Sequence, residues 1–196
     1  MSSGGDGYGW VMEAVDLYEL PLLRYARRLV DDLDLAADAV QHTFLKLCEE
    51  SQDRLDGRVA PWLFRVCRNR ALDHLRHSGR EQPLLDADAA GGATQRPSAA
   101  AAVPDGRAAD PAMAAERADL AGRLRELLAD LPAPQRETID LWCEGMTYRQ
   151  IAEITGRQEG HVRVLAHRGL SALRGHPLVR ELLADDPGRS GPTAHD

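Results

Sequence analysis

The sequence predicts an all-α protein in which two small helical domains are joined by a flexible linker. Apolar residues recur at helical spacing over residues 10–80 and again over residues 113–184, which are the two expected domains. Residues 81–112 between them consist largely of Ala, Gly, Pro and Asp and hold few large apolar side chains. The two ends, residues 1–9 and 185–196, are polar and rich in glycine, and we expect them to be disordered.

Three helices are expected in the first domain, over residues 10–30, over residues 35–50 and within residues 58–80. Pro21 lies inside the first helix and is expected to split or kink it, because proline removes a backbone hydrogen bond. The stretch SQDRLDG at residues 51–57 is predicted to be a loop. Apolar residues step by four along one face of the third helix, which predicts a buried side made of Leu63, Cys67, Ala71 and Leu75.

The linker at residues 81–112 cannot bury enough apolar surface to offset the entropy of ordering its chain. A coil of about 32 residues averages roughly 30 Å end to end and stretches to about 100 Å. Such a linker allows the two domains to act at separate places.

The second domain begins near Met113 with a leucine-rich helix. Pro132 and Pro134 end that helix and open the next, because proline fits the first turn of a helix but not its interior. Thr147 with Gln150 three residues later forms a predicted capping box, in which each residue satisfies a free backbone N–H at a helix start.

A helix-turn-helix is predicted where Gly156 makes a tight turn between the helix after Thr147 and a second helix from about Glu159. The inner side of the second helix is expected to hold Val162, Leu165, Ala166, Gly169 and Leu173. In DNA-reading proteins of this geometry the second helix enters the major groove. An αα-hairpin that only packs has the same spacing, but the basic side chains on the outer face, Arg163 and Arg168, favour DNA binding.

Charge is unevenly distributed along the chain. The 196 residues include 24 basic and 31 acidic side chains, a net charge of −7, which predicts weak binding of the free protein to nucleic acid. Residues 58–80, however, carry six arginines against a single aspartate, and residues 157–174 carry four arginines against a single glutamate. Two basic patches in an acidic chain suggest DNA contact at two places; two solvated helix faces are the alternative.

The three cysteines form no CxxC pair. Cys48, Cys67 and Cys143 each lie in an apolar helical pattern, so we expect buried, reduced thiols in a cytoplasmic protein. No charged-then-apolar leader opens the chain and no run approaches the length of a membrane span, so neither secretion nor membrane insertion is expected.

Two stretches resemble a known family. The sequence RVAPWLFRVCRNRALDHLR, preceded by ADAVQHTFLKL, resembles region 2 of bacterial RNA polymerase sigma factors of the extracytoplasmic-function group. The sequence LPAPQRETIDLWCEGMTYRQIAEITGRQEGHVRVLAHRGLSALR resembles their region 4. The resemblance implies a promoter-specific initiation factor with no catalytic centre and no cofactor. Its implied partners are core RNA polymerase, through the clamp of the largest subunit and the flap of the second-largest, and promoter DNA; by family habit we also expect an anti-sigma protein.

The resemblance assigns roles in the first domain. Asn69 falls where the family reads a flipped base of the minus-ten element, and an amide carries both the donor and the acceptor that a base edge needs. Phosphates of the separated strand would be held by Arg65, Arg68 and Arg76. Trp62 either stacks on a base or continues the apolar core. The implied contacts to the polymerase clamp are Asp38, Gln41 and His42, the last at a position that is usually acidic.

In the second domain the resemblance implies reading of the minus-thirty-five element as duplex. The implied contact residues are Arg157, Gln158, His161, Arg163, Val164, His167 and Arg168. The arginines can bind phosphates or guanine edges. Gly169 stands where the family has Ala, and glycine inside a helix costs about 1 kcal/mol.

Three other function classes fit parts of the sequence. A stand-alone helix-turn-helix regulator predicts tight duplex binding without polymerase, which the acidic net charge disfavours. A sigma-like protein that docks on polymerase without reading DNA is the second class. The third is an enzyme, since His74 and His77 form an H-x-x-H spacing near Cys67; no Glu stands between the histidines as in a zinc protease, and a solvated basic face is the favoured interpretation.

Overall fold

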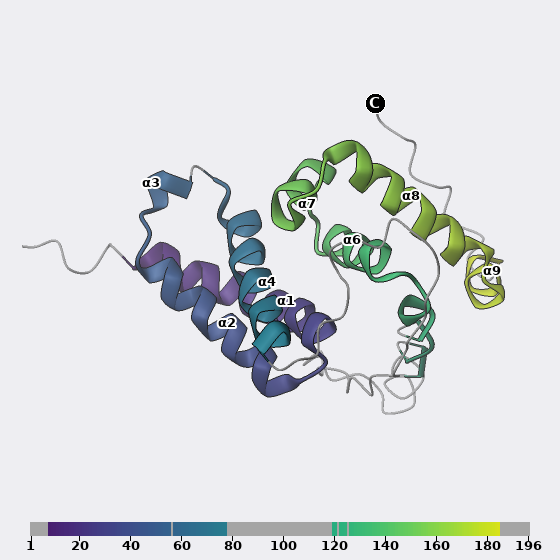
Figure 1. Cartoon of the computed structure of the whole chain (residues 1–196), viewed down its shortest axis with the longest axis horizontal. Coiled ribbons are helices and arrows are strands. Elements are labelled where there is room, and N and C mark those ends of the chain that lie inside the picture. Colours follow the sequence, from purple (N-terminus) through teal and green to yellow (C-terminus); the bar gives the residue numbers. More distant parts are fainter. Residues whose placement is uncertain (1–7, 56, 78–118, 121, 125, 185–196) are drawn as a thin grey trace, which may run out of the picture.

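The computed structural model describes residues 8–55, 57–77, 119–120, 122–124 and 126–184. All regular structure in these residues is helical. The expected linker at 81–112 and both expected disordered ends, apart from residues 8 and 9, lie outside the described residues. The described helices form two groups that lie side by side (Figure 1).

The first group, unit one, is built from α1 (Gly9–Val30), α2 (Leu33–Cys48), the short α3 (Gln52–Leu55) and α4 (Val59–His77). The three long helices pack on one another around large buried side chains, which include Leu22, Tyr25, Leu47, Leu63, Phe64 and Cys67. The rings of Tyr25 and Phe64 lie 5.3 Å apart with their planes tilted by 59°. The expected buried face of the third helix is confirmed, because each of its four apolar residues lies in this core.

Local signals set the helix ends in unit one. Asp31 adopts a left-handed φ of 55° after α1, and Asp32 caps α2 by accepting hydrogen bonds from the backbone N–H groups of Asp34 and Leu35 at 2.9 and 3.1 Å. Pro21 does not split α1, which runs as a single helix from Gly9 to Val30. The prediction of a loop over residues 51–57 was wrong in part, since residues 52–55 form the single turn of α3, anchored by the buried Leu55.

The second group, unit two, contains helical residues within 119–129, then α6 (Ala133–Cys143), α7 (Tyr148–Thr155), α8 (Glu159–Gly175) and α9 (Pro177–Ala184). Helix α6 begins directly after Pro132, as predicted. The predicted inner side of α8 is confirmed: Val162, Leu165, Ala166 and Gly169 are buried and Leu173 is half-buried.

The helix-turn-helix consists of α7, a three-residue turn and α8. The backbone N–H of Gln150 donates to the Thr147 hydroxyl at 3.3 Å and the Gln150 side chain accepts from the Thr147 N–H at 2.9 Å, so the capping box is formed. Gly156 adopts a φ of 72°, a conformation that costs glycine little. The predicted motif is confirmed at both its start and its turn.

Gly169 has a packing role that the sequence did not indicate. A Cβ atom at this position would lie 2.5 Å from Ile139 Cδ1 and 3.5 Å from Gln135 Cβ, both on α6. The absence of a side chain therefore lets α8 approach α6 closely, which offsets the low helix propensity of glycine.

The two units share one apolar cluster. Helix α4 of unit one packs against α7 of unit two, and the cluster continues from Phe64 and Leu72 to Leu141, Met146 and Ile151. The sequence predicted two domains separated by a linker, and the described residues show those two units in direct contact.

The prediction of three buried thiols was wrong for two of them. Cys67 is fully buried, but Cys48 and Cys143 are exposed near the ends of α2 and α6, and all three are free thiols. Among the described residues, no helix combines the length and the apolar character needed to cross a bilayer.

Candidate nucleic-acid interface

The outer face of α8 is the most open of the predicted DNA contacts. Four of the predicted contact residues on α8 lie at i, i+1, i+4 and i+5 and are exposed: Arg163, Val164, His167 and Arg168. Gln158 is exposed at the N-cap, where its side chain makes no capping bond, and His161 is half-buried. The arrangement presents cationic and hydrogen-bonding groups at the helix that a helix-turn-helix inserts into a major groove.

Arg163 is held in place by two neighbours. Its guanidinium donates to Glu159 Oε1 from Nη2 at 2.8 Å and from Nε at 3.3 Å, and its Cζ lies 5.4 Å from the centre of the Tyr148 ring. The side chain is 64% exposed, so the ion pair is screened by water and leaves the guanidinium open to a stronger anion. Tyr148 at the start of α7 thus positions a side chain of α8.

The outer face of α4 exposes a second group of predicted contacts. Asn69 and Arg65 are exposed, and Arg76 is exposed while paired with Asp73 at 2.9 Å. Trp62 is half-buried, packs against the apolar cluster and lines a small cavity of about 260 Å³ between the units. The cavity is also lined by Arg54, Arg58, Arg65 and Glu153.

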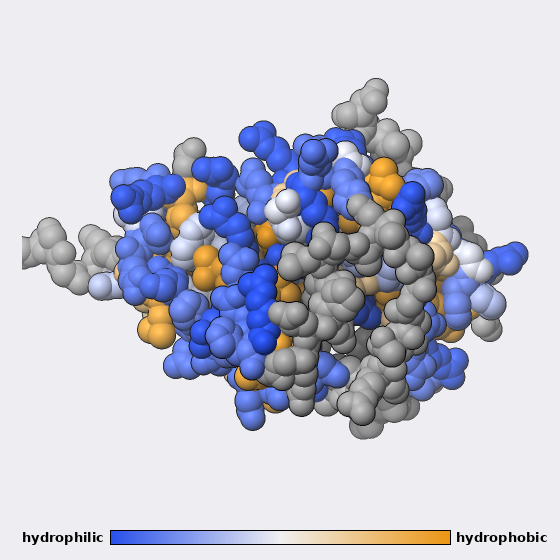
Figure 2. Space-filling model, in the orientation of Figure 1, coloured by the Kyte–Doolittle hydropathy of each residue, from blue (hydrophilic) through white to orange (hydrophobic). Residues whose placement is uncertain are grey.

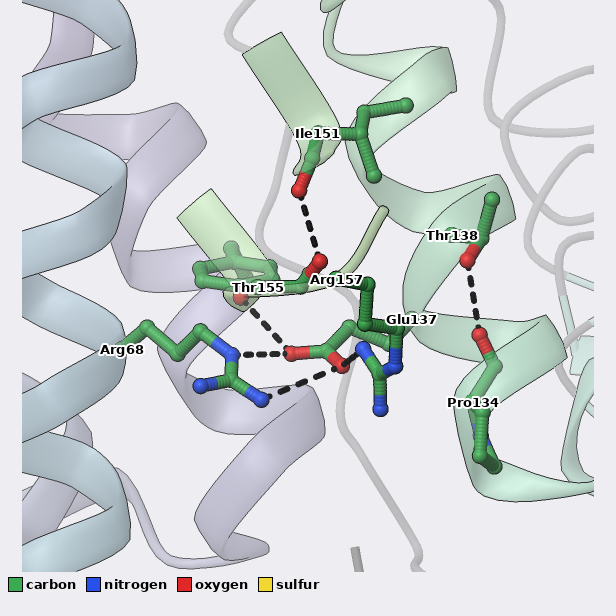
Figure 3. A network of polar contacts seen from close by, with 8 residues as sticks. Arg68, Pro134, Glu137, Thr138, Ile151, Thr155 and Arg157 are labelled. Atoms are coloured by element: carbon green, nitrogen blue, oxygen red, sulfur yellow. Dashed lines mark hydrogen bonds and ion pairs between the residues drawn. The ribbon is translucent and has the colours of Figure 1, made fainter. Parts of the chain in front are cut away.

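Arg68 and Arg157, predicted contacts from different units, do not lie on an open surface. Both bind the carboxylate of Glu137 on α6 (Figure 3). Arg68 Nε donates to Glu137 Oε1 at 2.6 Å, and Arg157 Nη1 donates to Oε2 at 2.9 Å. The Tyr25 hydroxyl adds a third donor to Oε1 at 3.1 Å. We call these four residues the Glu137 cluster.

Burial and charge act against each other in the Glu137 cluster. The side chains of Arg68, Glu137 and Arg157 are 6%, 2% and 15% exposed. Burial acts to raise the pKa of Glu137, but the two guanidinium groups outweigh it and hold that pKa below its ordinary value. Burial acts to lower the pKa of Arg68, but Glu137 outweighs it, and burial raises the pKa of Tyr25. The cluster is therefore fully ionised near neutral pH.

Neighbouring hydroxyl groups do not compete for the Glu137 carboxylate. Thr138 donates to the backbone carbonyl of Pro134 at 2.8 Å, and Thr155 donates to that of Ile151 at 2.7 Å (Figure 3). Each buried hydroxyl is thus satisfied within its own helix.

Two ion pairs flank the Glu137 cluster between α1 and α6. Arg28 Nη1 lies 2.9 Å from Asp140 Oδ1, and Arg24 Nη2 lies 3.0 Å from Glu144 Oε2. Burial raises the pKa of Asp140 to about 6, against the lowering effect of Arg28. The three acidic residues follow i, i+3, i+7 spacing and form one stripe on α6, which we call the acidic stripe.

The acidic stripe was missed by sequence reasoning. Its signal was available, because acidic residues at i, i+3 and i+7 share a helix face, and Arg24 and Arg28 at i, i+4 share another. Nothing in the spacing indicated that the two faces meet.

The predicted polymerase contacts lie on α2. Gln41 is exposed and His42 is half-buried. Asp38 was expected to pair with an arginine of polymerase, but it already binds Arg70 Nη2 at 2.9 Å and His74 Nε2 at 2.7 Å on α4. The hydrogen bonds from His74 and then Arg70 lower the pKa of Asp38. Its side chain remains 46% exposed and accessible to a partner.

The H-x-x-H spacing does not form a metal site in the structure. His74 faces Asp38, while His77 Nδ1 lies 2.7 Å from the backbone oxygen of Asp73. No group of three metal-ligating side chains was found among the described residues.

The face shown in Figure 2 is largely hydrophilic, with small separate hydrophobic spots between charged side chains. Exposed apolar residues of the described part, such as Met12, Leu45 and Val164, come from different helices. This mixed surface fits a protein with several contact regions rather than one large apolar interface.

Known proteins match the chain in the same two segments. Residues 14–81 match the family model for sigma-70 region 2, and residues 121–173 match that for sigma-70 region 4. The chain is 34% identical over 152 residues to the RNA polymerase sigma factor CarQ of Myxococcus xanthus, covering 76% of this chain and 79% of that protein. It is 24% identical over 163 residues to the ECF RNA polymerase sigma factor SigM of Bacillus subtilis, covering 83% and 91%.

A solved structure shares the fold. The sigma factor RpoE of Bartonella quintana, crystallised with the anti-sigma factor NepR, aligns with a TM-score of 0.56 and 24% identity over 91% of this chain and 99% of its own. The matched regions cover both helical units, and the relatives match across both. The chain therefore belongs to the RNA polymerase sigma factors of the extracytoplasmic-function group.

Proposed function

We propose that this sigma factor directs core RNA polymerase to promoters by reading DNA with both of its units. Unit two reads the minus-thirty-five element as duplex through the outer face of α8. Unit one melts the minus-ten element and holds it as single strand through the outer face of α4. The observation that carries this proposal is that each unit exposes basic and amide side chains on one helix, Arg163 and Arg168 on α8 and Arg65 and Asn69 on α4.

The chain supplies recognition and the polymerase supplies chemistry. Exposed Gln41 and partly exposed Asp38 on α2 offer a docking surface for the clamp of the largest polymerase subunit, and the flap of the second-largest subunit is the proposed partner of unit two. We assign no catalytic centre and no cofactor to the chain, and place its action in the cytoplasm with the polymerase. An anti-sigma protein is a further proposed partner, supported by the neighbour structure solved with one.

The two units must separate on the polymerase. Promoter elements two helical turns apart lie about 70 Å from each other along the duplex. Units that share an apolar cluster and a buried ion pair contact each other directly. Reading both elements therefore requires that the polymerase hold the units apart, within the stretched reach expected of residues 81–112.

Run-off transcription with purified core polymerase on a genomic promoter library tests the proposal. Asn69→Ala and Arg168→Ala should each lower promoter-specific transcription at least about tenfold, because each removes a base or phosphate contact. Both variants should retain core binding in a titration. Arg123→Ala is the matched control, since Arg123 is exposed and pairs only within its own helix segment, with Asp119 at 3.1 Å.

The competing assignments give different results in the same assay. A sigma-like docking protein would bind core and show no loss on Asn69→Ala. A stand-alone regulator would bind duplex without core, and core would ignore it. Either pattern would remove the proposed function.

A further inference from the structure

The Glu137 cluster contains one predicted DNA contact from each unit, and this rests on the proposed function. Arg68 of α4 is assigned to the minus-ten strand, and Arg157 precedes α8 at the minus-thirty-five contact. Both guanidinium groups are bound to one carboxylate and shielded from solvent. A guanidinium cannot hold a buried carboxylate and a DNA phosphate at the same time.

Glu137 offers these arginines what a phosphate would offer. Its two oxygens accept from Arg68 at 2.6 Å and from Arg157 at 2.9 Å, the short, charge-assisted geometry that arginine also makes with phosphate oxygens. Glu137 is on α6, which carries no predicted DNA contact. The carboxylate therefore competes with DNA from inside the protein.

The contact between the units is polar where it could have been apolar. Around the Glu137 cluster, Asp140 and Glu144 of the acidic stripe meet Arg28 and Arg24, whose side chains are 35% and 40% exposed. Buried and half-buried ion pairs hold a contact in register, yet their net stabilisation is small because separation returns every charge to water. Such an interface is specific and can be opened by a larger partner.

We propose that Glu137 is an internal latch that holds the free sigma factor closed, with its DNA-contact arginines occluded until core polymerase separates the units. In the closed form Arg68 and Arg157 are unavailable to DNA, which suppresses promoter binding by the free factor. On the polymerase the latch opens and both arginines become available to phosphates.

The distance between the units measures the latch directly. Spin labels go on native Cys48 of α2 and on Ser171→Cys of α8, in a Cys143→Ser background. Both positions are exposed, whereas Cys67 is buried with its thiol pKa raised to about 12 and will not react. The otherwise unchanged chain should give one narrow distance distribution, and Glu137→Gln should broaden and lengthen it. Glu126→Gln, the same change at an exposed residue of unit two, should not.

A second variant keeps the test valid if Glu137→Gln does not fold. Arg24→Glu with Arg28→Glu places like charges opposite the acidic stripe and leaves the Glu137 cluster untouched. It should lengthen the same distance. If Glu137→Gln and this double variant both retain the narrow distribution, or if the unchanged chain is already broad, the latch is refuted.

DNA binding by the free, unlabelled factor tests occlusion. The probe is fluorescent short duplex of mixed sequence at low salt. Glu137→Gln should bind about tenfold more tightly than Glu126→Gln, because the fraction of competent molecules limits the apparent affinity. Equal affinities in an opened Glu137→Gln would overturn the brake. If the unchanged factor fails in run-off transcription while its label distance still responds to Glu137→Gln, the proposed function fails and the contact between the units stands.

Discussion

Helices α4 and α8 have similar sequences of inner apolar and outer basic residues, yet the structure treats their outer faces differently. In α8 the outer residues Arg163 and Arg168 remain exposed. In α4 the outer row is interrupted, because Arg68 is 5% exposed and bound to Glu137 of the other unit. Helical spacing assigns a residue to one face of its own helix, and a second unit then decides whether that face meets water.

The largest expected effect contrasts the inner and outer rows of α4. Phe64→Ala should lower the free energy of unfolding by about 4 kcal/mol, because the ring is fully buried against Tyr25 and its removal leaves a cavity. Asn69→Ala should change it by less than about 0.5 kcal/mol, since the side chain is exposed. Urea unfolding followed by circular dichroism measures both, and similar losses for the two variants would contradict the assigned faces.

The next effect compares the two arginines directly. Arg68→Ala should cost about 3 kcal/mol of stability, because it leaves Glu137 buried with one cation fewer. Arg168→Ala should be neutral within about 0.5 kcal/mol while lowering promoter-specific transcription. Thermal unfolding and run-off transcription of both variants provide the measurement. An Arg68→Ala protein as stable as Arg168→Ala would mean that the units do not pack in solution as they do in the structure.

A smaller effect comes from pH and Asp140. Its pKa is about 6 in the folded chain against an ordinary value of 3.8, so the folded form binds the proton more tightly. Stability should therefore rise by about 1 kcal/mol as pH falls from 7 to 5, and this gain should level off near the ordinary value. Arg28 of α1 and Arg136, Glu137 and Glu144 of α6 act on the same carboxyl group.

Asp140→Asn should flatten that pH dependence, and Asp119→Asn, at an exposed carboxyl, should leave it unchanged. The window stops at pH 5 because Glu137 has a lowered pKa and its stabilisation is lost as pH falls through that lowered value. Denaturant midpoints at several pH values measure the slope. A slope that survives Asp140→Asn would assign the proton to another group.

The smallest effect concerns the close approach of α8 to α6. Gly169→Ala gains helix propensity but forces Ile139 to move, so we expect a net loss of about 1 kcal/mol. Ile139→Val removes the Cδ1 atom that lies 2.5 Å from the added Cβ. In a double-mutant cycle the two changes should couple favourably by about 0.5–1 kcal/mol. Additive effects would show that Gly169 is not needed for this contact.

Much of the local structure could be predicted. The capping box at Thr147, the glycine turn at Gly156 and the inner row of α8 were all expected, because each depends on groups within a few residues of one another. The one-turn α3 was not expected, since a polar stretch of that length carries no periodic signal. Cys48 and Cys143 were expected to be buried, but apolar patterns do not locate helix ends, where both residues are exposed.

The candidate site could be predicted only in part. The open residues of α8 and the exposed Asn69 of α4 followed from spacing and family resemblance. The occlusion of Arg68 and Arg157 could not, because the spacing of one helix does not reveal its partner. The internal pairing of Asp38 with Arg70 and His74 was missed for the same reason.

The sequence by itself determined the helices, their caps, the helix-turn-helix and the division into two units, because these depend on hydrogen bonds and apolar faces local to each segment. Only the tertiary structure decided that the units touch and that Glu137 joins them. Arg68 and Glu137 are 69 residues apart in the chain, and an ion pair over that separation forms only when packing has already brought the two helices together. The chain therefore records where its charges are, and the fold decides which of them DNA can reach.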